Sequence, residues 1–357
     1  MSGVLIASFG DILINRHDPQ NAFCFLSDFM DGMDIIIGNY EGVITDNPRP
    51  IGGRRGATIS SGCNVNGLKN FNVLSLANNH ALDSGISGLS DTLDFFNSVG
   101  VKKIGAGCTH EEAWEPEYIE CKGLKIAIFG ITGVYRSGTN ACEWQGGVAA
   151  IRSRDYYSSP YNGAVVPGAL PLIHTEVNED DWCYFASAVK KAHLKADVIV
   201  TMIHWGDHEK NYSITQFEKE LSSRMQSLGV QLVVGHHHHQ MRGFQFKGAS
   251  LICYGLGNAV FDQPNYKNPD HKTDFLLPDL SRYSGVTVTS FDKTGLVNAY
   301  LLPIYVEGTT PVAIQRGSAR WSEFVQIQTL CANQGMYNCI LNDRGTQIKG
   351  FTVFDLM

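Results

Sequence analysis

Four consecutive histidines directly follow a short apolar run in this chain. Residues 232–234 are apolar, Gly235 follows, and residues 236–239 are all histidine. The apolar part is typical of a buried β-strand, and the run is internal, so we do not interpret it as an expression tag. Histidines two positions apart on a strand point the same way, because side chains alternate in direction. The sequence therefore predicts metal binding by His236 with His238 or by His237 with His239, the other interpretation being a solvated polar loop.

Six other apolar runs end in the same way, in polar residues or glycine. Each is short and bounded by turn residues, as is typical of buried β-strands. Amphipathic patterns between them predict helices: one over residues 86–96, one capped by Asn178, and one capped by Ser213 with Gln216 three residues later. This alternation predicts an α/β architecture with βαβ units. The six runs are residues 4–9, 34–38, 72–77, 125–129, 197–203 and 250–254.

The C-terminal part of the chain has a different pattern. Residues 284–290 and 296–306 predict a hairpin, and residues 318–357 predict one helix followed by strands. We therefore expect a main domain over residues 1–310 and a β-rich C-terminal extension over residues 311–357 packed on it. Within the main domain, residues 43–63 and 134–176 form two long loops, which are typical of functional lids or disordered insertions.

Composition excludes several classes of protein. The net charge of -7 argues against a nucleic-acid partner. No apolar run approaches the 18 or so residues of a membrane span, and the first residues lack the basic start of a signal peptide. The nine cysteines are scattered and form no C-x-x-C motif, which fits a reducing compartment. We expect a cytoplasmic protein without a membrane span, and the sequence does not predict its oligomeric state.

Side chains that bind metals follow the carboxyl ends of most of these expected strands. In an α/β sheet such ends meet at one edge, so we expect these side chains to converge. Carboxylates hold and bridge hard cations, imidazoles complete the shell, and two ions about 4 Å apart clamp a phosphoryl oxygen. The candidates are Asp11, Asn39, Glu41, Asn79, His80, His204, His237 and His239.

The order of these motifs resembles the poly-γ-glutamate capsule-synthesis family of the CapA type, which is similar to the calcineurin-like metallophosphoesterases. The stretch from Asn78-Asn79-His80 to Asp83-Ser84-Gly85 and the triplet 204–206, His-Trp-Gly, are its most distinctive parts. The resemblance implies a two-sheet β-sandwich flanked by helices, in the order αββα. The motifs that carry it are residues 10–11, 39–42, 76–85, 204–206, 235–239 and 254–258.

The resemblance also implies a role for each site residue. His80 would be the general acid or would stabilise the transition state, and Asp83 would orient it. Glu41 would bridge two divalent transition-metal ions (Mn, Fe, Zn or Co). The remaining ligands would be Asp11 and His239 for the first metal, and Asn79, His204 and His237 for the second.

The chain departs from the family pattern at three positions, of which one is the bridging acid, Glu41 in place of aspartate. Leu13 stands two residues after Asp11, where phosphoesterases usually carry a histidine, so the first metal would have one ligand fewer. His17 is a possible substitute, in an expected loop farther along the chain. His238 stands where the family usually has proline, which keeps both histidine registers open.

We expect a small anionic substrate, either a phosphoester or a γ-glutamyl compound. Arg54 and Arg55 would bind the anion through their guanidinium groups, with Asn39 and Asn258 as further substrate-binding residues. The leading hypothesis is a metal-dependent phosphoesterase that uses a metal-bound hydroxide. The alternatives are an accessory or biosynthetic protein of poly-γ-glutamate assembly, and metal-dependent amide hydrolysis or acyl transfer.

Overall fold

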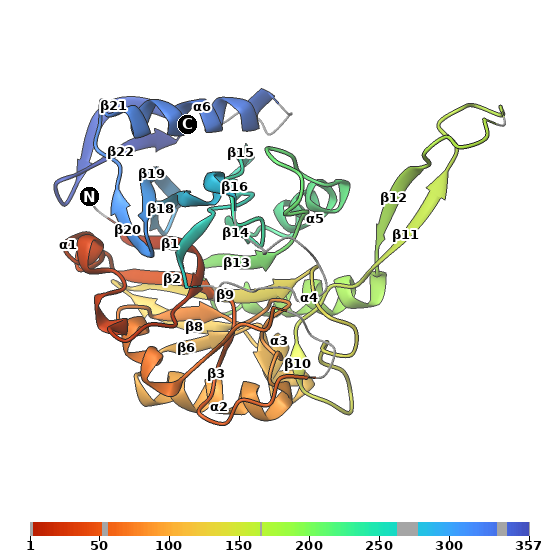
Figure 1. Cartoon of the computed structure of the whole chain (residues 1–357), viewed down its shortest axis with the longest axis horizontal. Helices are drawn as coiled ribbons and strands as arrows, with labels where there is room; N and C mark the ends of the chain where they lie inside the picture. Colours follow the sequence, from red (N-terminus) through yellow and green to blue (C-terminus); the bar gives the residue numbers. More distant parts are fainter. Residues whose placement is uncertain (1–2, 52–55, 165, 263–277, 334–340, 357) are drawn as a thin grey trace.

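Two β-sheets lie at the centre of the computed structural model, which describes residues 3–51, 56–164, 166–262, 278–333 and 341–356 (Figure 1). The larger sheet has the strand order β21 (Leu341–Ile348), β22 (Phe351–Leu356), β19 (Gly295–Glu307), β18 (Tyr283–Asp292), β1 (Val4–Leu13), β2 (Ile35–Tyr40), β5 (Val73–Ser75) and β6 (Lys102–Ile104). The smaller has the order β15 (Phe244–Lys247), β16 (Ser250–Cys253), β14 (Leu232–His236), β13 (Val198–His204), β9 (Leu124–Thr132) and β8 (Glu117–Cys121). Each of the six predicted runs, and the run before the histidines, overlaps one of these strands, although only residues 73–75 of the run 72–77 form a strand.

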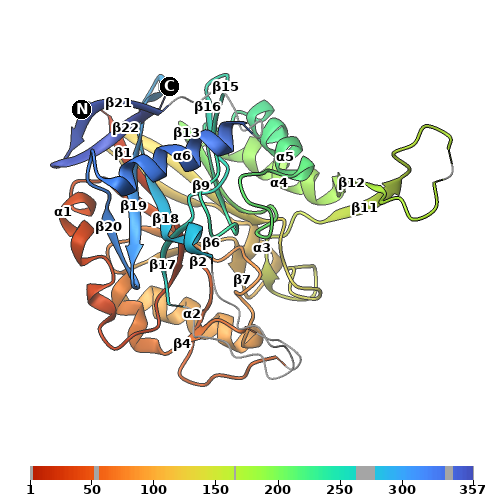
Figure 2. The ribbon, with the colours of Figure 1, turned by 45° about the horizontal axis from the view of Figure 1, so that its top comes forward.

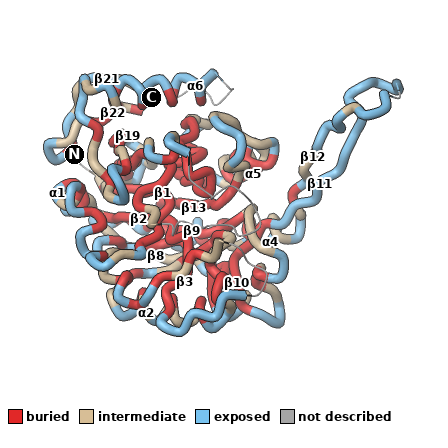
Figure 3. Tube along the Cα trace, viewed as in Figure 1, coloured by how far each residue is buried: buried red, intermediate tan, exposed pale blue. Residues whose placement is uncertain are grey.

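Helices cover the outer face of each sheet, and three apolar cores hold the layers together. The short α1 (Ser27–Met30) and α2 (Gly85–Ser98) pack on the larger sheet, and their buried residues share one core with it. The smaller sheet packs against α3 (His110–Trp114), α4 (Glu179–Ala192) and α5 (Gln216–Ser227) through a second core. Side chains of both sheets, such as Ile6 and Val200, form a third core between them. The predicted sandwich with helices on both faces is confirmed, and Figure 3 shows its buried centre.

Two of the predicted helix starts can be compared with the structure. Asn178 caps α4, as predicted, and its side chain accepts a hydrogen bond from the Asp181 N–H. The predicted Ser213 cap of α5 is wrong. Thr215 is the N-cap, and it forms a capping box with Glu218, whose carboxylate accepts the Thr215 N–H at 2.6 Å. In this box the Glu218 carboxylate accepts the Thr215 N–H and the Thr215 hydroxyl accepts the Glu218 N–H, and these two bonds favour Thr215 as the start.

Residues 311–333 and 341–356, the described part of the predicted extension, add strands to the larger sheet. The predicted hairpin is present as antiparallel β18 and β19, and β22 pairs with the outer edge of β19. Helix α6 (Ala319–Asn333) covers this edge, where the Trp321 and Phe324 rings stack on Phe354 (Figure 2). Strand β20 (Thr310–Ala313) also pairs with β19.

The two segments predicted as long loops contain strands. In the first, β3 (Val43–Ile44) pairs with β4 (Ile59–Ser60). In the second, β10 (Gly147–Val148) pairs with β7 (Ala106–Gly107), and β11 (Ser153–Ser158) pairs with β12 (Leu172–Val177). The β11–β12 hairpin projects as an exposed arm (Figures 1 and 2). Its strands are polar on both faces near the body, so they lack the apolar alternation that marks a half-buried strand.

No helix in the described part of the chain is both long and apolar enough to cross a membrane.

Candidate metal centre

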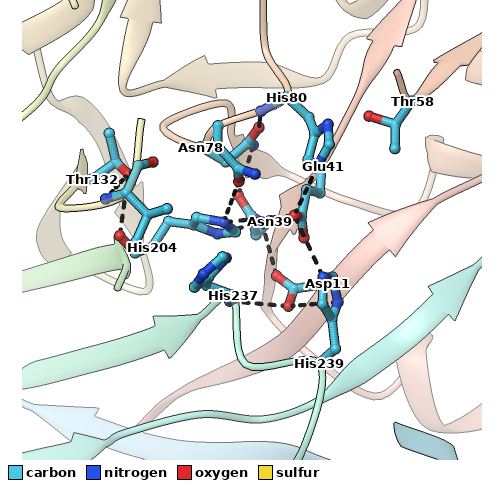
Figure 4. A network of polar contacts seen from close by, with 12 residues as sticks. Asp11, Asn39, Glu41, Thr58, Asn78, His80, Thr132, His204, His237 and His239 are labelled. Carbon is cyan, nitrogen blue, oxygen red and sulfur yellow. Dashed lines mark hydrogen bonds and ion pairs between the residues drawn. The ribbon is translucent and has the colours of Figure 1, made fainter. Parts of the chain in front are cut away.

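The candidate ligands converge where parallel strands of the two sheets end (Figure 4). Asp11 lies near the end of β1, and Glu41 directly follows β2, which is its parallel neighbour. His204 is the last residue of β13, and His237 directly follows β14, which is the parallel neighbour of β13. The carboxyl ends of four strands therefore bring two carboxylates and two imidazoles from distant parts of the sequence into one place.

Two overlapping groups of side chains have the spacing of metal ligands. In one, ligand atoms of Glu41, His204 and His237 lie within 4.8 Å of one another, and the other group contains Asp11, Glu41 and His239. Glu41 belongs to both, with its Oε1 atom 3.6 Å from His204 Nε2 and 3.7 Å from His239 Nε2. This geometry is that of a carboxylate shared between two adjacent sites, the position that the family resemblance implies for Glu41.

Buried atoms without partners indicate that a cation fits these groups. Both carboxylate oxygens of Glu41 are buried and have no hydrogen-bond partner among the described residues, and the same holds for His237 Nδ1. Buried polar atoms are almost always hydrogen-bonded, so an unpaired buried carboxylate needs another counterpart. Carboxylate oxygens with imidazole nitrogens are the donor set of divalent Mn, Fe, Co and Zn. The residues present therefore fit the metal ions that the sequence predicts.

Burial shifts the pKa values of these groups toward their neutral forms. Burial raises the pKa of Asp11 to about 7, although hydrogen bonds from Asn39 and the His237 N–H oppose the shift. Burial, followed by the charges of Asp11 and Asp83, raises the pKa of Glu41 well above its usual value. Burial also lowers the pKa of His239 to about 3. Neutral imidazoles keep a lone pair for a metal, and a cation would restore the charge of the carboxylates.

The structure distinguishes between the two histidine registers. His236 Nε2 donates to the Phe9 carbonyl at 3.2 Å, and His238 Nε2 donates to Glu218 Oε1 at 3.0 Å. Of the four consecutive histidines, His237 and His239 belong to the two ligand groups, and His236 and His238 do not. Strand β14 ends at His236, and His237 and His239 both have positive φ values, 92° and 54°. These two side chains share one side because of a turn and not because of strand alternation.

His80 and Asp83 form a hydrogen-bonded pair beside the ligand groups. His80 Nδ1 lies 2.6 Å from Asp83 Oδ2, and His80 Nε2 lies 3.8 Å from Glu41 Oε1. Asp83 Oδ2 also accepts the Thr58 N–H at 2.9 Å. Burial raises the pKa of Asp83, but the hydrogen bond and charge of His80, the Thr58 N–H and the Arg136 charge together lower it below its usual value. Asp83 is thus an ionised group that orients the His80 ring.

Two predicted substrate-binding residues lie behind the ligands. Asn39 is fully buried, and its Nδ2 donates to Asp11 Oδ1 at 2.8 Å. Asn258 Oδ1 lies 2.8 Å from His239 Nδ1. These contacts favour a role in orienting ligands over contact with substrate. The other two predicted substrate-binding residues, Arg54 and Arg55, lie outside the described residues.

Three further positions from the sequence analysis are Asn79, Leu13 and His17. Asn79 Oδ1 lies 2.8 Å from His204 Nε2, at the edge of the group that contains His204. Leu13 is buried, so the position of the usual histidine is an apolar contact. His17 is exposed and belongs to neither ligand group. Neither Leu13 nor His17 adds a donor to the group of Asp11, Glu41 and His239.

Sequence reasoning missed two charged residues next to the site. Arg136 Nε donates to the Asn79 carbonyl at 3.3 Å and lies 3.6 Å from Asp83 Oδ1. It follows β9 in the segment predicted as a long loop, and no motif marks it. Glu218 contacts His238. The sequence does indicate Glu218, because a threonine three residues before a glutamate is typical of a capping box.

A comparison with known proteins identifies the family of this chain. The model of the family described as "Bacterial capsule synthesis protein PGA_cap" matches residues 5–263. The chain belongs to this family. The resemblance drawn from the motifs is therefore confirmed.

Relatives and solved structures extend this comparison. The PGA biosynthesis protein CapA of Bacillus subtilis (strain 168) is 27% identical over 343 residues, which cover 92% of this chain and 79% of the relative. The capsule biosynthesis protein CapA of Bacillus anthracis is 26% identical over 257 residues, which cover 70% of this chain but only 56% of that protein. The crystal structure of the calcineurin-like phosphoesterase YfkN from Bacillus subtilis aligns with a TM-score of 0.38 at 12% identity, over 93% of this chain and 98% of that one.

Proposed function

We propose that this PGA_cap-family chain is a metal-dependent hydrolase of a small anionic substrate, and that it hydrolyses phosphoesters. The observation that carries the proposal is the buried Glu41 carboxylate, unpaired by hydrogen bonds and shared by two ligand groups. Divalent ions held by these groups would polarise a phosphoryl oxygen and lower the pKa of a coordinated water. The chain itself supplies the ligand geometry, a proton donor and an anion-binding group.

His80 is the proton donor in this proposal. Its Nδ1 donates to Asp83, which leaves Nε2 on the side that faces Glu41. A proton at Nε2 would pass to the leaving oxygen as the ester bond breaks, and the ionised Asp83 would stabilise the protonated ring before transfer. The His80 side chain is 13% exposed, whereas those of Glu41 and His204 are fully buried, so it lies on the open side of the site.

Arg136 supports an anionic substrate. Its Nε is held by the Asn79 carbonyl, and its side chain remains 34% exposed. Its terminal nitrogens make no hydrogen bond within the described part of the chain. A guanidinium held at one nitrogen still presents a planar pair of donors, which matches phosphate or carboxylate oxygens.

Replacing Arg136 with alanine is expected to raise KM for a phosphomonoester about tenfold, because one charge-assisted hydrogen bond to the anion is lost. Steady-state kinetics on the metal-loaded protein measure this effect. Arg154→Ala removes an arginine from the exposed arm and serves as the control, with unchanged kinetics expected. A fall in kcat at constant KM would instead show that Arg136 acts through Asp83.

A second candidate function uses the same site. The relatives named for PGA biosynthesis favour a γ-glutamyl compound as substrate, through amide hydrolysis or acyl transfer. A metal-polarised carbonyl and a proton donor would serve that reaction as well. A role as an accessory protein of polymer assembly is the non-catalytic alternative.

Metal analysis followed by a substrate screen tests the proposal. The purified protein should bind about two transition-metal ions per chain, and the His237→Ala/His239→Ala double variant should lose most of both. The loaded protein is then assayed with phosphomonoesters, phosphodiesters and γ-glutamyl amides. No metal after reconstitution would overturn the proposal. Metal binding with turnover of γ-glutamyl amides alone would establish the second candidate, and metal binding without turnover would favour the accessory role.

A further inference from the structure

A buried hydrogen bond between His238 and Glu218 lies next to the candidate metal centre, directly between the two candidate ligands His237 and His239 in the sequence. His238 Nε2 donates to Glu218 Oε1 at 3.0 Å, and both side chains are almost completely buried. The other carboxylate oxygen, Glu218 Oε2, accepts the Thr215 N–H at 2.6 Å and the Thr215 hydroxyl at 2.8 Å. The first turn of α5 therefore fixes the Glu218 carboxylate, and the carboxylate in turn fixes the His238 ring.

Two glycines show how closely this pair is enclosed. A Cβ atom at Gly206 would lie 2.1 Å from His238 Nε2 and 2.9 Å from the Glu218 carboxylate carbon. A Cβ atom at Gly255 would lie 2.8 Å from His238 Nδ1. Gly206 belongs to the His-Trp-Gly motif that begins with the candidate ligand His204. The pair therefore packs directly against the backbone two residues after one ligand.

The backbone around His238 adopts an uncommon conformation. His237 and His239, the candidate ligands on either side, have φ values of 92° and 54°. Positive φ values at residues with a Cβ atom are unfavourable and persist where surrounding contacts enforce them. The hydrogen bond to Glu218 holds the ring of His238, the residue between them. Loss of that contact should therefore let the turn relax, so that the His237 and His239 side chains no longer point to the same side.

We propose that Glu218 is a positioning residue of the metal centre. Through His238 it holds the turn that presents His237 and His239, and through its contact with Gly206 it supports the turn after His204. Helix α5 thus orients ligands in both candidate groups, although it contributes none of them. This inference rests on the proposed metal-dependent function and adds to it a residue that touches neither metal nor substrate.

Metal affinity and imidazole signals, measured on four single variants, test the inference. Glu218→Ala and His238→Ala should each weaken metal binding about tenfold or more by isothermal titration, and the double variant should lose little beyond either one. Lys219→Ala is the matched control, because it truncates an exposed side chain next to Glu218 on the same helix and leaves the Glu218–His238 contact. Glu218→Gln should restore most of the affinity, since an amide can still hydrogen-bond to the His238 ring.

The outcomes separate the inference from the proposed function. Unchanged affinity in the Glu218→Ala and His238→Ala variants, or equal losses in the Lys219→Ala variant, would overturn the inference and leave the function standing. If the parent protein binds no metal, the proposed function fails. The positioning role is then read from the ¹⁵N-labelled imidazoles, whose His237 and His239 signals should move in the Glu218→Ala variant and stay in place in the Lys219→Ala variant. Unmoved signals would overturn it.

Discussion

Replacing Glu41 with glutamine is expected to remove most bound metal from both sites and to abolish hydrolysis. One carboxylate serves both ligand groups, so a single neutral amide weakens both at once. The same change should stabilise the metal-free protein by about 1–3 kcal/mol, because the buried carboxylate has no hydrogen-bond partner among the residues that the structure describes to offset its lost hydration. Metal content by mass spectrometry, hydrolysis rates, and urea unfolding with excess chelator measure the three effects.

The opposite signs of these effects make the Glu41 variant informative. A residue that only stabilises the fold would lose stability on substitution, whereas a residue kept for metal binding should gain it when metal is absent. Glu120→Gln is the control. It neutralises an exposed carboxylate that belongs to neither ligand group, and we expect it to change neither metal content nor stability. Retention of two ions by the Glu41→Gln variant would show that Glu41 is not the shared ligand.

The position of the site was predictable because strand ends are visible in the sequence. Apolar runs followed by Asp11, Glu41 and His204 gave the strands and the edge where they meet, and the structure places these residues together. The packing of the two sheets could not be predicted from hydrophobic periodicity, because buried strands have the same apolar pattern whichever sheet they belong to. It came from the resemblance of the ordered motifs, which the family comparison confirms.

The rest of the site depends on contacts that no local pattern encodes. The choice of His237 and His239 follows from a turn with two positive φ values, whereas the strand rule alone allowed either register. Arg136 reaches the site from a segment that has no motif, and Glu218 acts through an intervening histidine. Tertiary packing places such residues next to the site, and of these two only Glu218 belongs to a sequence motif, the capping box.

Replacing His80 with glutamine is expected to leave metal content unchanged and to lower kcat by about 10²–10⁴, the usual contribution of a general acid. His80 Nε2 lies 3.8 Å from Glu41 Oε1, but His80 belongs to neither ligand group, so its loss should not release metal. Asp83→Asn should give a smaller loss, because the ring then lacks the carboxylate that orients it and stabilises its charge. Metal content and steady-state kinetics measure both variants.

A comparison of two leaving groups tests whether His80 acts as a general acid. A nitrophenolate leaves readily without a proton, whereas an alkoxide does not, so His80→Gln should slow alkyl phosphates far more than nitrophenyl phosphate. His17→Gln, at an exposed histidine outside the site, should change neither rate. Equal losses for both leaving groups would mean that His80 stabilises charge on the phosphoryl group instead of donating a proton. A fall in metal content would place His80 among the ligands, because its ring nitrogen is then part of what holds the ions.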